Sequence, residues 1–111
     1  MDVEAWKAQM RRGAAELAVL GLLEVHERYG LELMEAFRAR PDIGIADGTI
    51  YPLLNRLEKE GRIVSRWAPD LGAGPPRKYY RLTPSGAEAL AAMRPVWRAF
   101  SNQMDELLGD N

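Results

Sequence analysis

The sequence contains no cysteine and only one histidine, His26. Without cysteine there is no disulfide and no thiolate metal site, and a lone imidazole is a poor basis for a histidine metal site or a catalytic dyad. No apolar run approaches the roughly 20 residues that a membrane-spanning helix requires. The charged N-terminal segment, residues 1–12, lacks the apolar core of a signal peptide. We therefore expect a cytoplasmic protein without membrane association.

Sequence features of enzymes are also scarce. The glycines of residues 71–76 are typical of a turn and lack the pattern of a phosphate-binding loop. No pair of carboxylates occurs in a recognisable catalytic setting. We therefore expect no catalytic residues, no cofactor and no metal.

The net charge of −1 is unevenly distributed. Residues 49–83 contain seven Lys and Arg residues and three acidic residues, a balance of +4, which leaves −5 on the rest of the chain. A basic segment on an acidic body is typical of a protein that presents one surface to phosphates. Chance clustering within a short window is the alternative.

The most informative stretch is 47–61, DGTIYPLLNRLEKEG. At helical spacing its apolar residues form one stripe: Ile50, Leu53, Leu54 and Leu57. The opposite face collects Gly48, Tyr51, Pro52, Asn55 and Lys59, with Arg56 at its edge. An amide, a phenol and positively charged side-chain ends can contact the groove of a DNA duplex, so this face is a candidate DNA-binding surface. The alternative is an ordinary amphipathic helix whose polar face is only solvated. We expect Asp47 or Thr49 to cap this helix and Gly61 to end it.

The remaining pattern predicts a winged helix-turn-helix. Helices are expected at 2–12, 14–27 and 31–40, with an interruption at Gly13 and a turn at 29–30. After Gly61 the apolar period changes to two, so 62–67 and 78–82 are predicted strands, and the Gly- and Pro-rich segment 68–77 joins them as a hairpin. Tyr80 and Leu82 are expected to face inward and Tyr79 and Arg81 outward, although a register slip by one residue would exchange them.

A final helix is predicted from Thr83–Pro84 to about Leu108. Its apolar residues follow an a/d heptad seam: Leu90, Met93, Trp97, Phe100, Met104 and Leu107. The N-terminal helix carries a second apolar set: Val3, Trp6 and Met10. Both sets suggest a homodimer, with residues 84–111 as a dimerisation helix attached to a DNA-binding domain at 1–83. The alternative is that the seam packs back on its own domain.

The fold predicts which residues contact DNA. Asn55 is the best residue for a base edge, because its amide can pair with adenine. Tyr51, Arg56 and Lys59 are expected to reach phosphates. On the wing, Arg77 and Lys78 are expected to meet the backbone or the adjacent minor groove.

Four segments make the chain resemble the PadR family of winged-helix transcriptional regulators, in its short form with one C-terminal helix. They are RRGAAELAVLGLL at 11–23, YGLELMEAF at 29–37, DGTIYPLLNRLEKEGRI at 47–63 and RKYYRLTPSGAEAL at 77–90. The resemblance implies a homodimeric repressor that binds double-stranded promoter DNA through the helix bearing Thr49, Tyr51 and Pro52 and through the wing around residues 77–79. It also implies release by a small phenolic or planar apolar effector, and Trp97 resembles a Trp that lines the dimer interface in some family members.

An effector slot would involve Trp97, Met93 and Phe100, with Trp6 nearby, because Trp and Met suit adaptable apolar binding. The alternative is that these side chains fill the dimer interface without a cavity. Two other functions stay open: a winged helix used only for protein–protein contact, and a ligand-binding or catalytic protein that has kept the scaffold.

Overall fold

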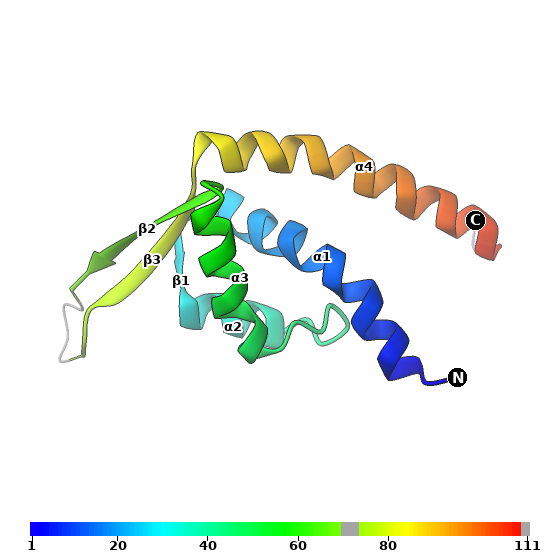
Figure 1. Cartoon of the computed structure of the whole chain (residues 1–111), viewed down its shortest axis with the longest axis horizontal. Helices are drawn as coiled ribbons and strands as arrows, with labels where there is room; N and C mark the ends of the chain where they lie inside the picture. The colour runs from blue at the N-terminus through cyan, green and yellow to red at the C-terminus, as the bar shows by residue number, and fades with distance from the viewer. Residues whose placement is uncertain (70–73, 110–111) are drawn as a thin grey trace.

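The computed structural model describes residues 1–69 and 74–109, so the centre of the predicted wing turn lies outside the described residues. Within these residues, four helices and a three-stranded sheet form a body from which the ends of α1 and α4 project on one side and the wing on the other (Figure 1). The longest dimension is 53 Å. The predicted fold class, mainly α with a small β wing, is confirmed. Within the described residues no helix is long and apolar enough to cross a membrane.

The first helix, α1, is continuous from Val3 to Val25, so the predicted interruption at Gly13 is wrong. A glycine inside a helix costs only about 1 kcal/mol relative to alanine, and the turns on both sides of Gly13 are good helix formers. Asp2 caps the helix by accepting hydrogen bonds from the backbone N–H groups of Glu4 (3.0 Å) and Ala5 (3.2 Å).

The predicted turn at 29–30 is instead a short strand, β1 (Arg28–Tyr29), followed directly by α2 (Gly30–Arg38). Glu32 accepts a hydrogen bond from the Tyr29 backbone N–H at 3.0 Å. Helix α2 ends two residues earlier than predicted, and Pro41 follows shortly after it. A strand of two residues is too short to show a period in the sequence, which is why the prediction missed it.

Helix α3 spans Asp47–Lys59 and buries its whole apolar stripe, as predicted: Ile50, Leu53, Leu54 and Leu57. The capping prediction is wrong, because Ala46 is the N-cap residue and no side chain caps the helix. Asp47 pairs with Arg38 of α2 instead. Gly61 does end the helix, with φ at +77°, and the backbone N–H of Arg62 donates to the carbonyl of Leu57 at 2.9 Å in a Schellman arrangement.

The sheet has the strand order β1-β3-β2, and both pairings are antiparallel. Strands β2 (Ile63–Ala68) and β3 (Arg77–Leu82) form the predicted wing within one residue at each end. Ile63 pairs with Leu82 and Ala68 with Arg77. Tyr80 is buried and Arg81 is exposed, which confirms the predicted facing of β3.

Helix α4 spans Pro84–Leu108 and begins at the predicted cap. The Thr83 hydroxyl accepts from the backbone N–H of Gly86 at 3.0 Å and donates to the carbonyl of Gly61 at 2.6 Å. A Cβ on Gly86 would overlap the backbone carbonyl oxygen of Arg62, so only glycine fits where α4 crosses the root of the wing.

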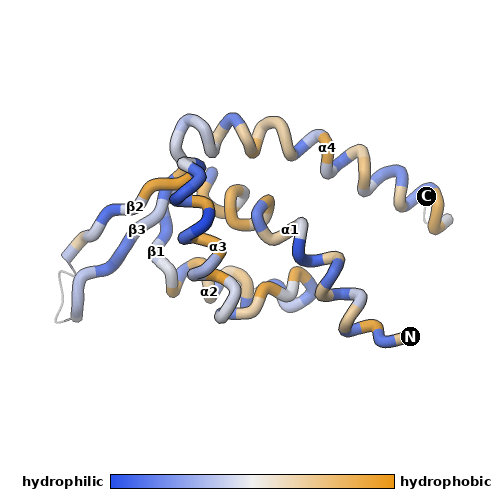
Figure 2. The backbone as a smooth tube through the Cα atoms, in the orientation of Figure 1, coloured by the Kyte–Doolittle hydropathy of each residue, from blue (hydrophilic) through white to orange (hydrophobic). Residues whose placement is uncertain are grey.

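The hydrophobic core lies where α1, α2, α3 and the sheet meet, and the tube in Figure 2 is most hydrophobic there. Its most deeply buried residues come from every helix and both wing strands: Val19, Leu20, Leu33, Ile50, Leu54, Leu57, Ile63, Tyr80 and Leu90. Of the predicted seam on α4, only Leu90 belongs to this core, whereas Trp97, Phe100 and Leu107 are exposed. Met93 is half-buried and packs against the core, so the seam is left uncovered by its own domain only from Trp97 onward.

Two glycine substitutions test the close contact at the root of the wing. We expect Gly86→Ala to destabilise the chain by about 1–3 kcal/mol, because the new methyl group has no room against the backbone of Arg62. Gly13→Ala is the matched control: it lies in a helix with nothing within 4 Å of the added Cβ, so it should stabilise by about 0.5–1 kcal/mol. Urea unfolding measures both, and a Gly86→Ala variant as stable as the parent would contradict this account.

Candidate nucleic-acid interface

The polar face of α3 is divided by its surroundings into a central ridge and two flanks. The ridge, which we define as Gly48, Pro52, Asn55 and Lys59, is exposed along its whole length. Within the described residues neither Asn55 nor Lys59 makes a side-chain hydrogen bond or ion pair. The ridge therefore presents an amide and an ammonium group that are both available to a partner.

One flank of α3 faces α1. Arg56, predicted to reach a phosphate, lies here and pairs with Glu16 of α1 (Nη2 to Oε2, 3.5 Å) and with Glu60 (Nη1 to Oε1, 3.2 Å). Thr49 lies on the same side and lines a cavity together with Arg56. Arg56 is thus already held by two carboxylates, in contrast to Lys59.

The other flank faces α2 and the wing. The tip of the Tyr51 ring lies against Gly30, where a Cβ would overlap its hydroxyl oxygen, so this predicted DNA contact also positions the start of α2. Glu58 accepts a hydrogen bond from the Ser65 hydroxyl and pairs with Lys78 (Nζ to Oε1, 3.7 Å). Lys78 therefore turns back toward α3 from the wing.

The wing face that is shared with α3 carries a cation between two aromatic rings. The Lys78 ammonium lies 5.9 Å from the Trp67 ring centroid and 5.5 Å from that of Tyr80. Burial raises the pKa of the Tyr80 hydroxyl, and the nearby Glu58 carboxylate adds to this effect. Trp67 is 68% exposed and was missed as a site residue. In β2, every second residue (63, 65 and 67) lies on this face, opposite residues 82, 80 and 78 of β3. This period of two is the sequence signal that places Trp67 here.

The outer face of the wing carries a second aromatic and cationic cluster. Tyr29 and Tyr79 meet edge to face with their centroids 5.4 Å apart. Arg77 lies 4.6 Å from the Tyr29 ring centroid, and Arg66 lies 5.0 Å from that of Tyr79. Arg66 also pairs with Glu27, and this hydrogen bond lowers the pKa of the Glu27 carboxyl. Tyr79 thus packs against β1, which joins the wing to the body.

The predicted effector residues lie on the far side of the molecule, between α1 and α4. A groove of about 550 Å³ is lined there by apolar side chains, among them Met10, Leu17, Met93, Val96, Trp97 and Phe100. The Trp97 and Phe100 ring centroids are 6.1 Å apart. Trp6 is 51% exposed and does not line this groove, so a single chain does not bring Trp6 and Trp97 together. Arg94 of α4 pairs with Glu24 of α1 at 2.7 Å and holds the two helices beside each other.

A three-helix core, a helix with an exposed polar ridge and a β wing beside it define the winged helix-turn-helix class. The model of the "Transcriptional regulator PadR-like family" matches residues 19–92. The chain belongs to this family of transcriptional regulators, which confirms the resemblance seen in the sequence.

Individual relatives agree with this assignment. A transcriptional regulator of Mycobacterium tuberculosis is 34% identical over 101 residues, which cover 91% of this chain and 89% of the relative. The crystal structure of a PadR family regulator from Eggerthella lenta is 35% identical, with a TM-score of 0.79 and coverage of 98% of this chain and 94% of that one. The structure of Bacillus subtilis PadR in complex with operator DNA matches with a TM-score of 0.64 and 30% identity, over 72% of this chain and 45% of that one.

The Glu27–Arg66 pair makes a pH-dependent contribution to stability. Its hydrogen bond lowers the pKa of Glu27 below the ordinary 4.5, so the folded state binds this proton less tightly than the unfolded state. The stabilisation is therefore present above pH 4.5 and is lost as the pH falls through the lowered pKa. We expect Glu27→Gln to be less stable than the parent at pH 7 and to approach it at low pH. The exposed Glu88→Gln serves as the control in urea unfolding at both pH values, and a pH-independent difference for Glu27→Gln would contradict the assignment.

Proposed function

We propose that this chain is a homodimeric repressor that reads a two-fold-symmetric promoter site with the α3 ridge and the wing, and that a small aromatic or apolar molecule releases it. The observation that carries the proposal is that Asn55 and Lys59 are exposed on the C-terminal half of α3 and have no side-chain partner among the described residues. A planar amide and a cation on one exposed helix face supply base recognition and phosphate binding together. The related Bacillus subtilis protein in complex with operator DNA supports this use of the fold.

The proposed DNA contacts have different roles. Asn55 reads a base edge, and Lys59 binds a phosphate. On the wing, Arg77, Lys78 and Tyr79 contact the backbone or the minor groove. Lys78 can exchange Glu58 for a phosphate at little cost, because a partly exposed ion pair contributes only about 0–1 kcal/mol.

The remaining predicted contacts lie at the edges of the ridge. Thr49 and Pro52 are exposed at the N-terminal half of α3, where we propose that they fit against the DNA backbone. Tyr51 and Arg56 reach the same surface from the two flanks, and both also position α3 through their contacts with Gly30 and Glu16.

The proposed dimer is supported by the apolar side chains on the projecting ends of α1 and α4. The exposed residues in this set are Val3, Trp6, Met10, Trp97, Phe100, Met104 and Leu107, with Met93 half-buried beside them. A monomer rarely exposes so many large apolar side chains next to one another. A second copy would bury them and, by its two-fold symmetry, place two α3 ridges on a palindromic site.

The proposed effector site is the groove between α1 and α4. Its volume of about 550 Å³ falls within the usual range for small-molecule sites, about 300–1,000 Å³. Trp97, Phe100 and Met93 would contact a flat ligand, and Trp6 would join them only from the partner subunit. This placement connects ligand binding to the same helices that form the proposed dimer.

Asn55 and Lys59 should differ in how their loss affects DNA binding. After selection of a tight site from genomic fragments, Asn55→Ala should relax base preference at one position per half-site, by about 1–3 kcal/mol. Lys59→Ala should weaken all sequences alike and lower the salt slope by about 1 per contacting subunit. Fluorescence anisotropy on site variants and a salt series measures both effects.

The matched controls are Asn102→Ala on α4 and Lys7→Ala on α1, both outside the proposed interface. Neither should change affinity or salt slope by more than experimental error. If Asn55→Ala retains the parent's base preference at every position, the ridge assignment is wrong.

Trp97 should be required for binding of a planar apolar probe but not for DNA binding. We expect Trp97→Ala to lose binding of acridine, followed by fluorescence titration, because the largest apolar wall of the groove is removed. Its affinity for the selected site should stay close to that of the parent, because the other apolar residues of the proposed dimer surface are unchanged. Trp67→Ala removes a tryptophan outside the groove and should leave acridine binding intact. Equal acridine affinity in the parent and Trp97→Ala would exclude this groove as the site.

A further inference from the structure

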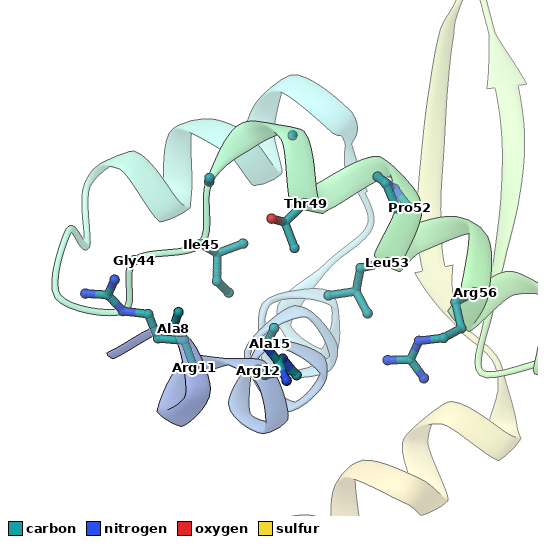
Figure 3. A pocket seen from close by; sticks show the side chains of 12 residues that line it. Ala8, Arg11, Arg12, Ala15, Gly44, Ile45, Thr49, Pro52, Leu53 and Arg56 are labelled. Carbon is teal, nitrogen blue, oxygen red and sulfur yellow. The ribbon is translucent and has the colours of Figure 1, made fainter. Parts of the chain in front are cut away.

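A second cavity lies on the opposite side of α1 from the apolar groove, between α1, the segment before α3 and the first turns of α3 (Figure 3). Its volume is about 670 Å³. The charged residues that line it are all arginines: Arg11, Arg12 and Arg56. Most of the other side chains in the wall are apolar: Ala8, Ala15, Ile45, Ala46, Pro52 and Leu53. The cavity therefore combines three arginines with a mainly apolar wall.

Arg11 is held in an unusual position at one end of this cavity. Its side chain lies across Gly44, which has φ at +70° and where a Cβ would overlap the guanidinium. The Nε–H of Arg11 is buried, and no residue of the described chain accepts a hydrogen bond from it. A buried donor without an acceptor is costly, so an anion that draws this side chain away from Gly44 would relieve that cost.

The charges of the three arginines are not equally compensated. Arg56 pairs with Glu16 and Glu60, as described above. Within the described residues neither Arg11 nor Arg12 makes an ion pair with a carboxylate. Two uncompensated guanidinium groups at one cavity match an anion of charge −2. The planar guanidinium fork, moreover, fits phosphate oxygens in a bidentate manner.

The start of α3 adds donors to the same wall. Thr49 lines the cavity with its hydroxyl group, and Gly48 lines it in the first turn. Because Ala46 has no capping side chain, the first backbone N–H groups of α3 have no side-chain acceptor, and these groups favour an anion.

We propose that this cavity is a binding site for a small phosphate monoester, whose dianionic head group binds at the arginine-lined wall and whose small apolar body lies against Ile45 and Leu53. The site is distinct from the groove at Trp97 and goes beyond the proposed repressor function. The alternative occupant is a backbone phosphate of duplex DNA, because Thr49, Pro52 and Arg56 of the same wall are also proposed DNA contacts.

Occupancy would have a defined effect on the neighbouring interface. The bound dianion would lie beside Thr49 and Pro52 at the N-terminal half of α3, close to where the DNA backbone is proposed to pass. Repulsion between this charge and the DNA phosphates should weaken DNA binding, and by linkage DNA should weaken binding of the phosphate monoester by the same factor.

The test uses phenyl phosphate as the probe and the full chain without DNA, in isothermal titration calorimetry at constant ionic strength. We expect phenyl phosphate to bind in the millimolar range or tighter, and benzyl alcohol, which has no charge, not to bind. Arg11→Gln and Arg12→Gln should each lower the affinity for phenyl phosphate by about tenfold or more, because each variant loses charge-assisted hydrogen bonds to the phosphate. Arg98→Gln removes the same charge from α4, outside the cavity, and should bind as the parent does.

A second variant keeps the test independent of the stability of Arg11→Gln. Ala8→Phe fills the cavity from the exposed side of α1 without removing a charge, so it should abolish binding while circular dichroism shows an intact fold. Absence of binding to the parent at millimolar phenyl phosphate would overturn the proposal. Equal binding by the parent, Arg12→Gln and Ala8→Phe would overturn it too. If phenyl phosphate does not bind but Arg11→Gln and Arg12→Gln both weaken DNA binding, the arginines contact the DNA backbone instead.

Discussion

Burial of the apolar stripe of α3 is the constraint on which the rest of the structure depends. Ile50, Leu54 and Leu57 are completely buried against residues of α1, α2 and the sheet. Each such side chain contributes about 1.5–3 kcal/mol when it leaves water, so any rotation of α3 about its axis would expose part of the stripe. Because the helix cannot rotate, the ridge on its opposite side is presented in one orientation. The wing is fixed to the same core through Tyr80 and Ile63, and α4 is fixed to the root of the wing through Gly86 and the Thr83 cap.

Ion pairs decide which cations of the basic segment are available to a partner. Glu16 and Glu27 of the acidic body hold Arg56 and Arg66, and Glu58 of α3 itself holds Lys78, so carboxylates neutralise three positive side chains near the interface. Lys59 has no such partner within the described residues. These pairs are exposed and individually weak, so they hold the arginine and lysine side chains in place without preventing exchange for phosphate. The small net charge of −1 therefore does not argue against a phosphate-binding surface.

Helix α1 lies between two cavities whose linings differ in chemistry. Toward α4 the helix contributes Met10 and Leu17 to an apolar groove, and toward α3 it contributes Arg11 and Arg12 to a cationic cavity. Residues 10 and 11 are adjacent in the chain, yet the helical turn of about 100° per residue points them to different sides. One helix thus connects the proposed dimer and effector groove to the start of the proposed recognition helix.

Local periodicity in the sequence determined the helix at 47–59, its buried stripe, the wing strands and the capped start of α4, because these features depend on neighbours within a few residues. The motifs at 47–63 and 77–90 likewise indicated the family that the comparison confirmed. Only the tertiary structure decided that α1 runs through Gly13, that Arg28 and Tyr29 add a strand to the wing, and that Ala46 begins α3. It also decided that Arg56 and Lys78 are held by carboxylates and that Arg11 and Arg12 reach the wall of a cavity beside α3. The ion pairs and the cavity depend on which distant side chains come within a few ångströms of one another, and the spacing of residues along the chain carries no information on that. The continuation of α1 through Gly13 is a local choice worth about 1 kcal/mol, too little for the sequence pattern to decide.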